Sequence, residues 1–358
     1  YFCNQLTELL TNYGEIFEVW FDGAKGSNAK KFEYDWQRYY DLIRKFQPKA
    51  NIAICGPDIR WVGNEEGYAL EEHWSTVRKL ELYDKGIPNG KQWMRGHADG
   101  TLWIPSETDV SIRPGWYYHA SEDHKLKSLS QLTDIYYESV GRNSLLLLNL
   151  TPNQEGLIPE QDSLRLVEWY RRYTSELKKN LVNQKMKVTG KNRKKLKYTL
   201  DGNRGTYWEA DTKTPVLEVD FGKELTFNRL LLQEFIEKGQ RVKQFVVEYF
   251  DNGNWQKLDE QTTIGYKRIL RFPEVWEALV RPVPPECRHL WSRGDGSWKI
   301  WNAKQDLLPK RLAKAVTSSW LSTQIGRKNS SSGAVWDNLF STLLKQAMSK
   351  GQKAKHLR

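Results

Sequence analysis

An apolar strand, a helix and a second apolar strand are expected in succession near the start of the chain, and this order constrains the fold more than any other feature. Residues 16–21 form a short apolar run that Gly23 ends. Residues 34–46 have helical spacing closed by Pro48, and residues 51–55 form the second apolar run. This order makes a βαβ unit, in which the two strands lie parallel in one sheet. Their carboxyl ends then meet at one edge, where ligands and catalytic groups collect in such folds.

Acidic residues follow both of these strands. Asp22 comes directly after the first run, and Glu65 and Glu66 lie in the segment 56–67 that follows the second. Asp22 has an alternative interpretation, in which it only opens the turn before Gly23. If the two segments share one edge of the sheet, they supply the pair of carboxyls that glycoside hydrolysis needs. One carboxyl attacks or stabilises the sugar cation, and the other protonates the leaving oxygen.

Three longer motifs surround these acids. They are Glu-Val-Trp-Phe-Asp-Gly-Ala at 18–24, Gly-Pro-Asp-Ile-Arg-Trp-Val-Gly-Asn-Glu at 56–65, and Trp-Ile-Pro-Ser-Glu-Thr-Asp-Val-Ser-Ile-Arg-Pro-Gly-Trp-Tyr-Tyr-His at 103–119. Together they resemble the α-L-fucosidases of glycoside hydrolase family 29, in the branch that acts on 1,3- and 1,4-linked fucose. The resemblance covers roughly residues 1–178. It implies a fucosylated oligosaccharide or glycoconjugate as substrate, and chemistry without a redox cofactor or catalytic metal.

The resemblance also implies a role for individual residues. Asp22 matches the nucleophile and Glu65 the general acid/base, while composition alone does not separate Glu65 from its neighbour Glu66. Trp116 matches an aromatic that lines the pocket for the fucose methyl group. Three further candidates for the same edge are Trp20, Trp103 and Glu107. Strand alternation places Trp20 on the same side as Asp22. Arg60 either pairs with a carboxylate in the pocket or forms a salt bridge elsewhere.

The first 178 residues predict an α/β fold with about four βα units. Strands are expected at 16–21, at 51–55, from about 102 and at 144–150, and helices at 1–11, 34–46, 125–139 and 161–177. A complete (β/α)₈ barrel has eight such units in about 250 residues. We therefore expect a partial TIM-type barrel, its C-terminal half. The histidines and aromatics that earlier strands supply in family 29 have no counterpart here, so the resemblance implies an N-terminally incomplete chain that is inactive alone.

A different pattern follows a Lys-rich linker at residues 179–186. Residues 187–275 contain short β-like segments at 217–221, 230–233, 245–250 and 266–272, separated by polar turns. The sequences Leu-Asp-Gly at 200–202, Thr-Tyr-Trp at 206–208 and Leu-Glu-Val-Asp-Phe-Gly at 217–222 resemble the discoidin, or factor 5/8 type C, domain. That resemblance implies a jelly-roll β-sandwich, a galactose-type carbohydrate-binding module and, in some family members, a structural calcium. The alternative is a purely structural support packed on the barrel.

Residues 276–358 form a basic tail that is rich in tryptophan and of unknown origin. They contain 15 Lys and Arg against 5 Asp and Glu, which leaves 40 basic and 39 acidic residues in the first 275. The body of the chain is therefore nearly neutral, and a phosphate-tracking groove is not indicated there, so we expect no nucleic-acid partner. Two explanations of the tail stay open: a segment that is not the native continuation of the domain, and an appendage that binds an acidic surface.

Composition sets the remaining limits. No apolar run approaches the roughly 20 residues needed to cross a bilayer, so no membrane span is expected. The three cysteines, Cys3, Cys55 and Cys287, indicate neither a disulfide framework nor a zinc site. No signal peptide is recognisable, and a secreted or periplasmic location is implied by the family resemblance. An alternative function is a non-catalytic carbohydrate-binding protein that acts through the β-sandwich.

Overall fold

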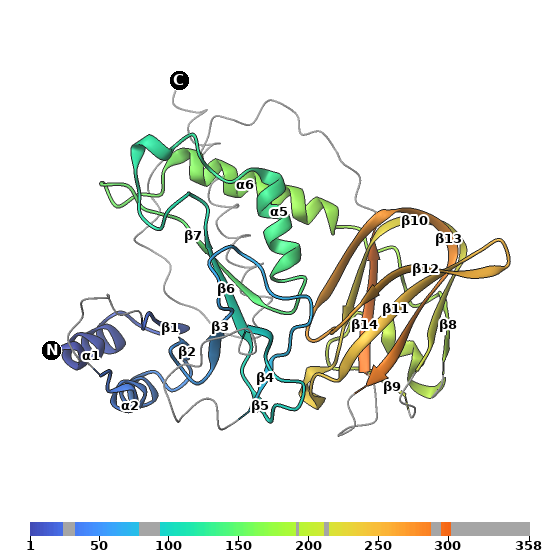
Figure 1. The fold of residues 1–358 in the computed structure, drawn as a ribbon, viewed down its shortest axis with the longest axis horizontal. Helices are drawn as coiled ribbons and strands as arrows, with labels where there is room; N and C mark the ends of the chain where they lie inside the picture. Colours follow the sequence, from blue (N-terminus) through green and yellow to red (C-terminus); the bar gives the residue numbers. More distant parts are fainter. Residues whose placement is uncertain (24–32, 79–93, 191–192, 211–214, 288–294, 302–358) are drawn as a thin grey trace, which may run out of the picture.

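The chain folds into an α/β domain followed by an all-β domain that packs against it (Figure 1). The computed structural model describes residues 1–23, 33–78, 94–190, 193–210, 215–287 and 295–301. The basic tail from residue 302 onward lies outside the described residues. Within the described part, no helix is both long enough and apolar enough to cross a bilayer.

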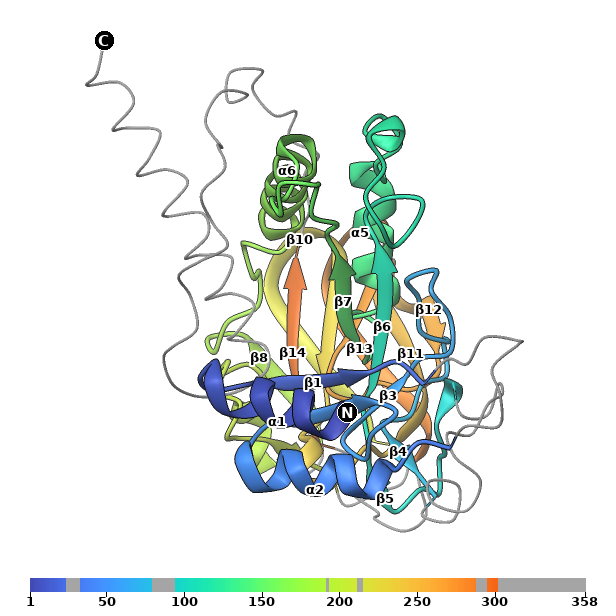
Figure 2. The ribbon, with the colours of Figure 1, turned by 90° about the vertical axis from the view of Figure 1, so that its left-hand side faces the viewer.

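The α/β domain is built on a parallel sheet with the strand order β1-β2-β3-β6-β7. Each neighbouring pair is parallel, so all five strands end at the same edge. The strands are β1 (Glu18–Phe21), β2 (Asn51–Ile54), β3 (Ile59–Trp61), β6 (Ser106–Ser111) and β7 (Leu145–Asn149). Figure 2 shows β1 lying across the direction of β6 and β7, because the sheet is strongly curled. This is the curled half-barrel expected of an incomplete TIM-type domain.

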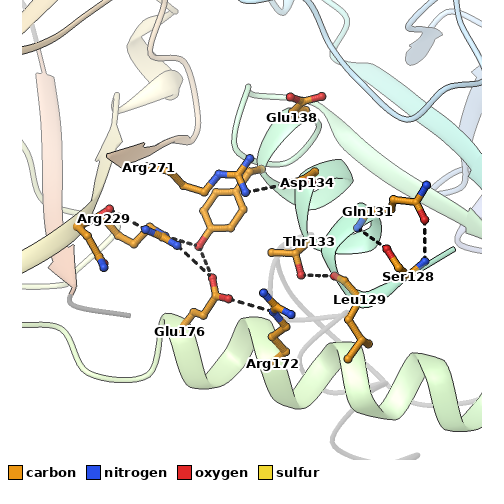
Figure 3. Close-up of polar contacts among 12 residues, drawn as sticks. Ser128, Leu129, Gln131, Thr133, Asp134, Glu138, Arg172, Glu176, Arg229 and Arg271 are labelled. Carbon is orange, nitrogen blue, oxygen red and sulfur yellow. Dashed lines mark hydrogen bonds and ion pairs between the residues drawn. The ribbon is translucent and has the colours of Figure 1, made fainter. Parts of the chain in front are cut away.

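Two pairs of helices cover the outer face of the sheet. The first pair, α1 (Phe2–Asn12) and α2 (Trp36–Phe46), packs on β1 and β2 through an apolar cluster that includes Leu10, Phe21 and Ile43. The second pair, α5 (Leu129–Glu138) and α6 (Glu160–Glu176), packs on β6 and β7 through a cluster that includes Val110, Leu132 and Trp169. Ser128 and Gln131 form a capping box at the start of α5, which satisfies two backbone donors there (Figure 3).

The structure corrects two features predicted for this domain. The segment 56–67, expected to be a loop throughout, contains the short strand β3, so Glu65 follows β3 rather than β2. The strand expected from residue 102 is β5 (Leu102–Trp103), which pairs antiparallel with β4 (Thr76–Val77) in a separate two-stranded sheet. The fourth strand of the parallel sheet is β6, a fully buried run of mostly polar residues that an apolar pattern does not detect.

The all-β domain is antiparallel and surrounds one apolar core. In the described part it has seven strands, in the order β12-β11-β13-β10-β14-β9 with β8 also paired to β10. The strands are β8 (Lys187–Gly190), β9 (Trp208–Glu209), β10 (Leu217–Gln233), β11 (Val242–Asp251), β12 (Asn254–Gln261), β13 (Arg268–Cys287) and β14 (Asp295–Trp301). Phe227, Phe245 and Leu230 lie at the centre of the core, each at most 1% exposed. The 3₁₀ turns are Ala120–Glu122, Arg193–Thr199 and Ile236–Lys238.

Strand boundaries in this domain differ from those expected. The segments 217–221 and 230–233 belong to one long strand, β10, with a bulge between Asp220 and Leu225 in its pairing with β13. The strand β12 was not predicted, because its exposed polar side chains mask the β pattern. The expected boundary at residue 275 falls inside β13, which continues to Cys287, and β14 then pairs with β10. The first part of the predicted tail is therefore paired in the sheet.

Buried hydrogen bonds join the two domains. The Gln240 side chain of the all-β domain accepts from the Ser75 backbone N–H at 2.8 Å and donates to the His73 carbonyl at 2.7 Å. The His73 N–H donates to the Thr263 hydroxyl at 2.9 Å, and Asn143 accepts from the Tyr266 N–H at 2.7 Å. Gln240 and His73 are at most 1% exposed. The two domains therefore meet in a specific interface of buried hydrogen bonds, the domain junction.

A second part of the junction lies beside α5 and α6, where Tyr137 is 3% exposed. Its hydroxyl donates to Glu176 and accepts from Arg229 of β10, both at 3.0 Å. Figure 3 shows Glu176 reached by Arg229 from the all-β domain and by Arg172 from its own helix. The Arg271 guanidinium lies 4.4 Å from the centre of the Tyr137 ring, and burial raises the pKa of Tyr137 to about 12. Tyr137 thus stays a neutral hydrogen-bond donor at physiological pH.

Candidate active site

The carboxyl edge of the parallel sheet gathers the acids predicted from the sequence. Asp22 comes directly after β1, Glu65 comes four residues after the end of β3, and Trp116 lies in the loop after β6. Because these strands are parallel, all three residues belong to the same edge. Asp22 and Glu65 are both exposed, as groups that meet a substrate must be.

The inner face of the curled sheet is polar, whereas the outer face is apolar. On β1, Phe21 packs outward against the rings of Trp36 and Tyr39, so strand alternation turns Trp20 and Asp22 inward. On β6, Val110 packs outward with α5 and α6, so Glu107 and Asp109 turn inward. The inner face of the sheet therefore carries acids and indoles.

Two indole–carboxyl hydrogen bonds cross this inner face. Trp20 Nε1 of β1 donates to Glu107 Oε1 of β6 at 2.9 Å, and Trp61 Nε1 of β3 donates to Asp109 Oδ1 of β6 at 2.6 Å. Three strand spacings, about 14 Å along a flat sheet, separate β1 from β6. The contact between Trp20 and Glu107 therefore requires the sheet to curl toward this face.

Trp116 contacts the predicted acid/base directly. Its Nε1 donates to Glu65 Oε2 at 3.0 Å, and Asn149 at the end of β7 donates to the Trp116 carbonyl at 3.2 Å. Trp116 is 36% exposed, so part of its ring surface faces solvent. This contact brings together two of the predicted residues, and it favours Glu65 over Glu66 as the acid held toward the site.

A buried ion pair holds the loop that carries Trp116. Arg113 donates from Nε and Nη2 to the two oxygens of Asp162, at 2.8 and 2.7 Å, and from Nη2 to Asp123 at 2.8 Å. The side chains of Arg113 and Asp162 are fully buried. Because Asp162 lies in the first turn of α6, this pair ties the loop after β6 to that helix. The position of Trp116 thus depends on a rigid element.

Burial dominates the electrostatics of the inner face. Burial and, to a smaller extent, the charge of Glu18 raise the pKa of Glu107 to about 8, while the bond from Trp20 opposes the change. Burial likewise raises the pKa of Glu18 to about 7. Burial also raises the pKa of Asp109, against the bond from Trp61, and the charges of Glu65 and Asp22 add to the increase. The charges of both predicted catalytic carboxylates therefore oppose ionisation of Asp109.

Arg60 was expected to pair with a carboxylate in the pocket or to form a salt bridge elsewhere, and the structure instead shows it bound to backbone carbonyls. Its side chain is fully buried, and it donates to the Ile104 carbonyl at 2.9 Å and to the Trp74 carbonyl at 2.8 Å. It also lies 3.4 Å from His73 Nε2. Burial lowers the pKa of Arg60 to about 9. These contacts indicate a structural role, in which Arg60 joins β3 to the segments that contain Trp74 and Ile104.

Sequence reasoning missed two members of the inner face, Trp61 and Asp109, and gave Glu107 no partner. The motif 103–119 contains polar residues in alternation, the acids Glu107 and Asp109 and then Ser111, which is the two-residue period of a strand. That alternation is a signal for a strand, but an apolar pattern does not detect it because these residues are polar.

The inner face of a curled parallel sheet with an exposed pair of carboxyls and bordering indoles is the arrangement of a glycoside hydrolase. Residues 1–176 match the profile of the family described as Alpha-L-fucosidase. The chain belongs to this family. Residues 184–301 match the F5/8 type C domain profile.

Individual relatives agree with this assignment. The chain is 40% identical over 289 residues to alpha-L-fucosidase 1 of Arabidopsis thaliana, a match that covers 78% of this chain and 56% of the relative. It superposes on the solved structure of SpGH29 with a TM-score of 0.78 and 34% identity, covering 85% of this chain and 68% of that one. For a Ruminococcus gnavus GH29 fucosidase in complex with fucose the TM-score is 0.76 and the identity 29%, with 85% and 65% covered.

The chain spans about half the length of the curated relatives it matches, 56% and 54%. Among the described residues, no group of three or more His, Cys, Asp and Glu side chains is arranged to hold a metal ion. The discoidin-type match extends the all-β domain to residue 301, which agrees with the pairing of β14 with β10.

Proposed function

We propose that this chain carries the catalytic carboxyls of an exo-acting, retaining α-L-fucosidase that hydrolyses terminal 1,3- or 1,4-linked L-fucose from glycans. The observation that carries the proposal is the shared position of Asp22 and Glu65. They follow two parallel strands of one sheet at the same edge, and the charges of both act on the Asp109 carboxyl. The fucose-bound relative from Ruminococcus gnavus supports the sugar as the ligand class.

In this proposal the reaction has two steps. Asp22 attacks the anomeric carbon of fucose and forms a fucosyl-enzyme, while Glu65 gives its proton to the departing glycosidic oxygen. Glu65 then takes a proton from water as the water oxygen bonds to the anomeric carbon; the bond to Asp22 breaks, which restores its carboxylate and releases fucose with its original anomeric configuration. Retention needs carboxyls about 5–5.5 Å apart. Trp116, which binds Glu65, keeps the acid/base directed toward the leaving group. The chemistry needs no cofactor or catalytic metal.

Chemical rescue tests the assignment of the nucleophile. In a protein extended at its N-terminus to complete the barrel, we expect Asp22→Gly to lower kcat on an aryl α-L-fucoside with a good leaving group by at least about 1,000-fold. Added azide should restore turnover and give a β-fucosyl azide, because azide enters from the face that the carboxylate leaves empty. Undiminished activity of Asp22→Gly, or rescue that gives the α-azide, would refute the assignment.

A pair of neighbouring variants tests the acid/base. Glu65→Gln should lower kcat/KM on a fucosylated oligosaccharide by roughly 100- to 10,000-fold, and much less on the aryl fucoside, whose leaving group needs no protonation. Glu66→Gln is the matched control, since it changes the same side chain one residue away. Equal losses in both variants would remove Glu65 from the proposed role.

A second candidate function rests on the F5/8 type C match over residues 184–301. In it the chain is a carbohydrate-binding protein without catalysis, acting through the all-β domain. Glycan binding that survives Asp22→Asn, combined with no turnover by the unchanged chain, would favour this function. Both proposals place the protein where glycans are exposed, as a secreted or periplasmic protein. The second proposal also includes a structural calcium site in the all-β domain.

A further inference from the structure

Two acids of strand β6 on the inner face take no part in the proposed reaction. Glu107 and Asp109 lie two residues apart on β6, are 5% and 3% exposed, and each accepts a hydrogen bond from an indole N–H. Burying a carboxyl costs free energy that hydrogen bonds offset only in part, because desolvation disfavours its charged form. A strand that places two of them side by side, facing inward, therefore calls for an explanation.

The partners of these acids connect them to the predicted catalytic pair. Trp20, bound to Glu107, lies on β1 two residues before Asp22, which directly follows the strand on the same face. Trp61, bound to Asp109, is the last residue of β3, which leads to Glu65. Strand β6 thus holds, through one indole each, the two strands that end in the two predicted catalytic carboxyls.

The hydrogen bonds also fix how the indoles are presented. An indole has one polar atom, its N–H, and the remainder of the ring is apolar. In Trp20 that atom is tied to Glu107, while the side chain stays 37% exposed. The ring is therefore held by its edge, and its exposed part is apolar surface beside Asp22. An apolar ring face is the surface that packs against the C–H face of a sugar.

We propose that Glu107 and Asp109 are positioning residues of the fucosidase site. Each locks a tryptophan whose strand leads to a catalytic carboxyl, so that the separation of Asp22 from Glu65 is set by contacts to the one strand β6. Glu107 in addition holds the Trp20 ring as a packing surface for the sugar. This inference rests on the proposed function, and it assigns these acids to orienting other groups rather than to proton transfer or attack.

Three variants of the full chain separate positioning from general stability. Glu107→Gln keeps an oxygen that accepts from Trp20, Glu107→Leu removes the acceptor, and Trp20→Phe removes the donor but keeps an aromatic ring. Glu8→Leu, on the exposed side of α1, is the matched control for replacing a glutamate with leucine. Folding of every variant is checked by circular dichroism and thermal unfolding before any other measurement.

The first readout needs no turnover. In ¹⁵N-labelled protein, the indole N–H resonance of Trp20 is identified as the one that Trp20→Phe removes. Glu107→Leu should shift this resonance and expose it to faster exchange with water, while Glu107→Gln and Glu8→Leu leave it protected. A Trp20 indole signal that is unchanged in Glu107→Leu would overturn the proposal. Should Glu107→Leu fail to fold, the hydrogen-exchange rate of the same indole N–H in the unchanged protein replaces it, and exchange as fast as that of a solvent-exposed indole would overturn the proposal equally.

The second readout is the kinetics on an aryl α-L-fucoside. Misplacing a reacting group by about 1 Å costs on the order of 100-fold, so Glu107→Leu and Trp20→Phe should each lower kcat/KM by about 10- to 100-fold. The double variant should lose no more than the worse single one, because both changes break one contact. Glu107→Gln should regain most of the activity. Losses that add fully would refute the positioning role. Because the resemblance implies that this chain alone is inactive, the kinetics are measured in a protein extended at its N-terminus; absence of turnover there would refute the proposed function and leave the indole measurement to decide the contact.

Discussion

The buried ion pair behind the Trp116 loop gives a prediction whose size follows from the structure. Arg113 and Asp162 are both fully buried and share two hydrogen bonds, at 2.8 and 2.7 Å. Replacing Asp162 with alanine leaves the Arg113 guanidinium buried with one carboxylate, Asp123, whose side chain is 38% exposed. Breaking a buried pair by removing one partner costs about 3–5 kcal/mol, because an uncompensated charge stays in the interior.

The assay is thermal unfolding at neutral pH, followed by far-ultraviolet circular dichroism. For a domain of about 150–250 residues, the size range of the α/β domain, each kcal/mol lowers Tm by roughly 2–4 °C, so Asp162→Ala should lower it by about 6–20 °C. Asp134→Ala is the matched control. Asp134 pairs with Arg271 at 2.6 Å, but their side chains are 48% and 34% exposed, and such a pair contributes about 0–1 kcal/mol (Figure 3). Equal shifts in the two variants would refute the argument from burial.

Two further predictions concern the inner face and the domain junction. Since the pKa of Glu107 in the folded chain is about 8 rather than 4.5, its stabilising contribution is complete below about pH 4.5 and is lost as the pH rises through 8. Glu107→Gln should therefore leave the free energy of unfolding similar at pH 5 and raise it by up to roughly 4 kcal/mol at pH 9, as measured by urea titration. A variant that is less stable than the unchanged chain at pH 9 would contradict this. Gln240→Leu removes a donor and an acceptor that pair with His73 and Ser75 in the junction, and should cost about 2–5 kcal/mol in the same assay. Gln256→Leu on the exposed strand β12 is its control, and an equally small effect of both would show that the junction does not contribute.

The sequence predicted the elements whose two faces are both apolar or whose ends carry clear signals. Strand β7 reads as four leucines and an asparagine, and it was expected within a residue of its observed bounds, Leu145–Asn149. Helix α2 was expected at residues 34–46 and is found at Trp36–Phe46, where Asp35 caps its start. Asp22 was placed correctly at the end of β1, because a glycine follows the apolar run at once.

What the sequence did not predict shares one physical cause. Strand β6 reads Ser-Glu-Thr-Asp-Val-Ser, and every one of these residues is buried. On its outer face Ser106 and Thr108 are paired with Ser144, and on its inner face the carboxyls are paired with indoles. Partners that satisfy buried polar groups come from distant parts of the chain, and single residues in the sequence carry no sign of them. Arg60, whose partners are backbone carbonyls, escaped prediction for the same reason.

The polar inner face has a consequence for the relation between stability and activity in this fold. Glu18, Glu107 and Asp109 are held where burial raises the pKa of each, so the folded chain carries them at a cost that an apolar lining would avoid. If the acids only filled space, replacing them would be neutral or stabilising and would leave turnover unchanged. If they hold the indoles and the strands beside Asp22 and Glu65, catalysis must fall when a replacement removes the oxygen that accepts from the indole N–H. Such a replacement lowers activity even where it stabilises the fold at high pH. Stability and activity moving in opposite directions at Glu107 is therefore the signature that separates a functional inner face from an incidental one.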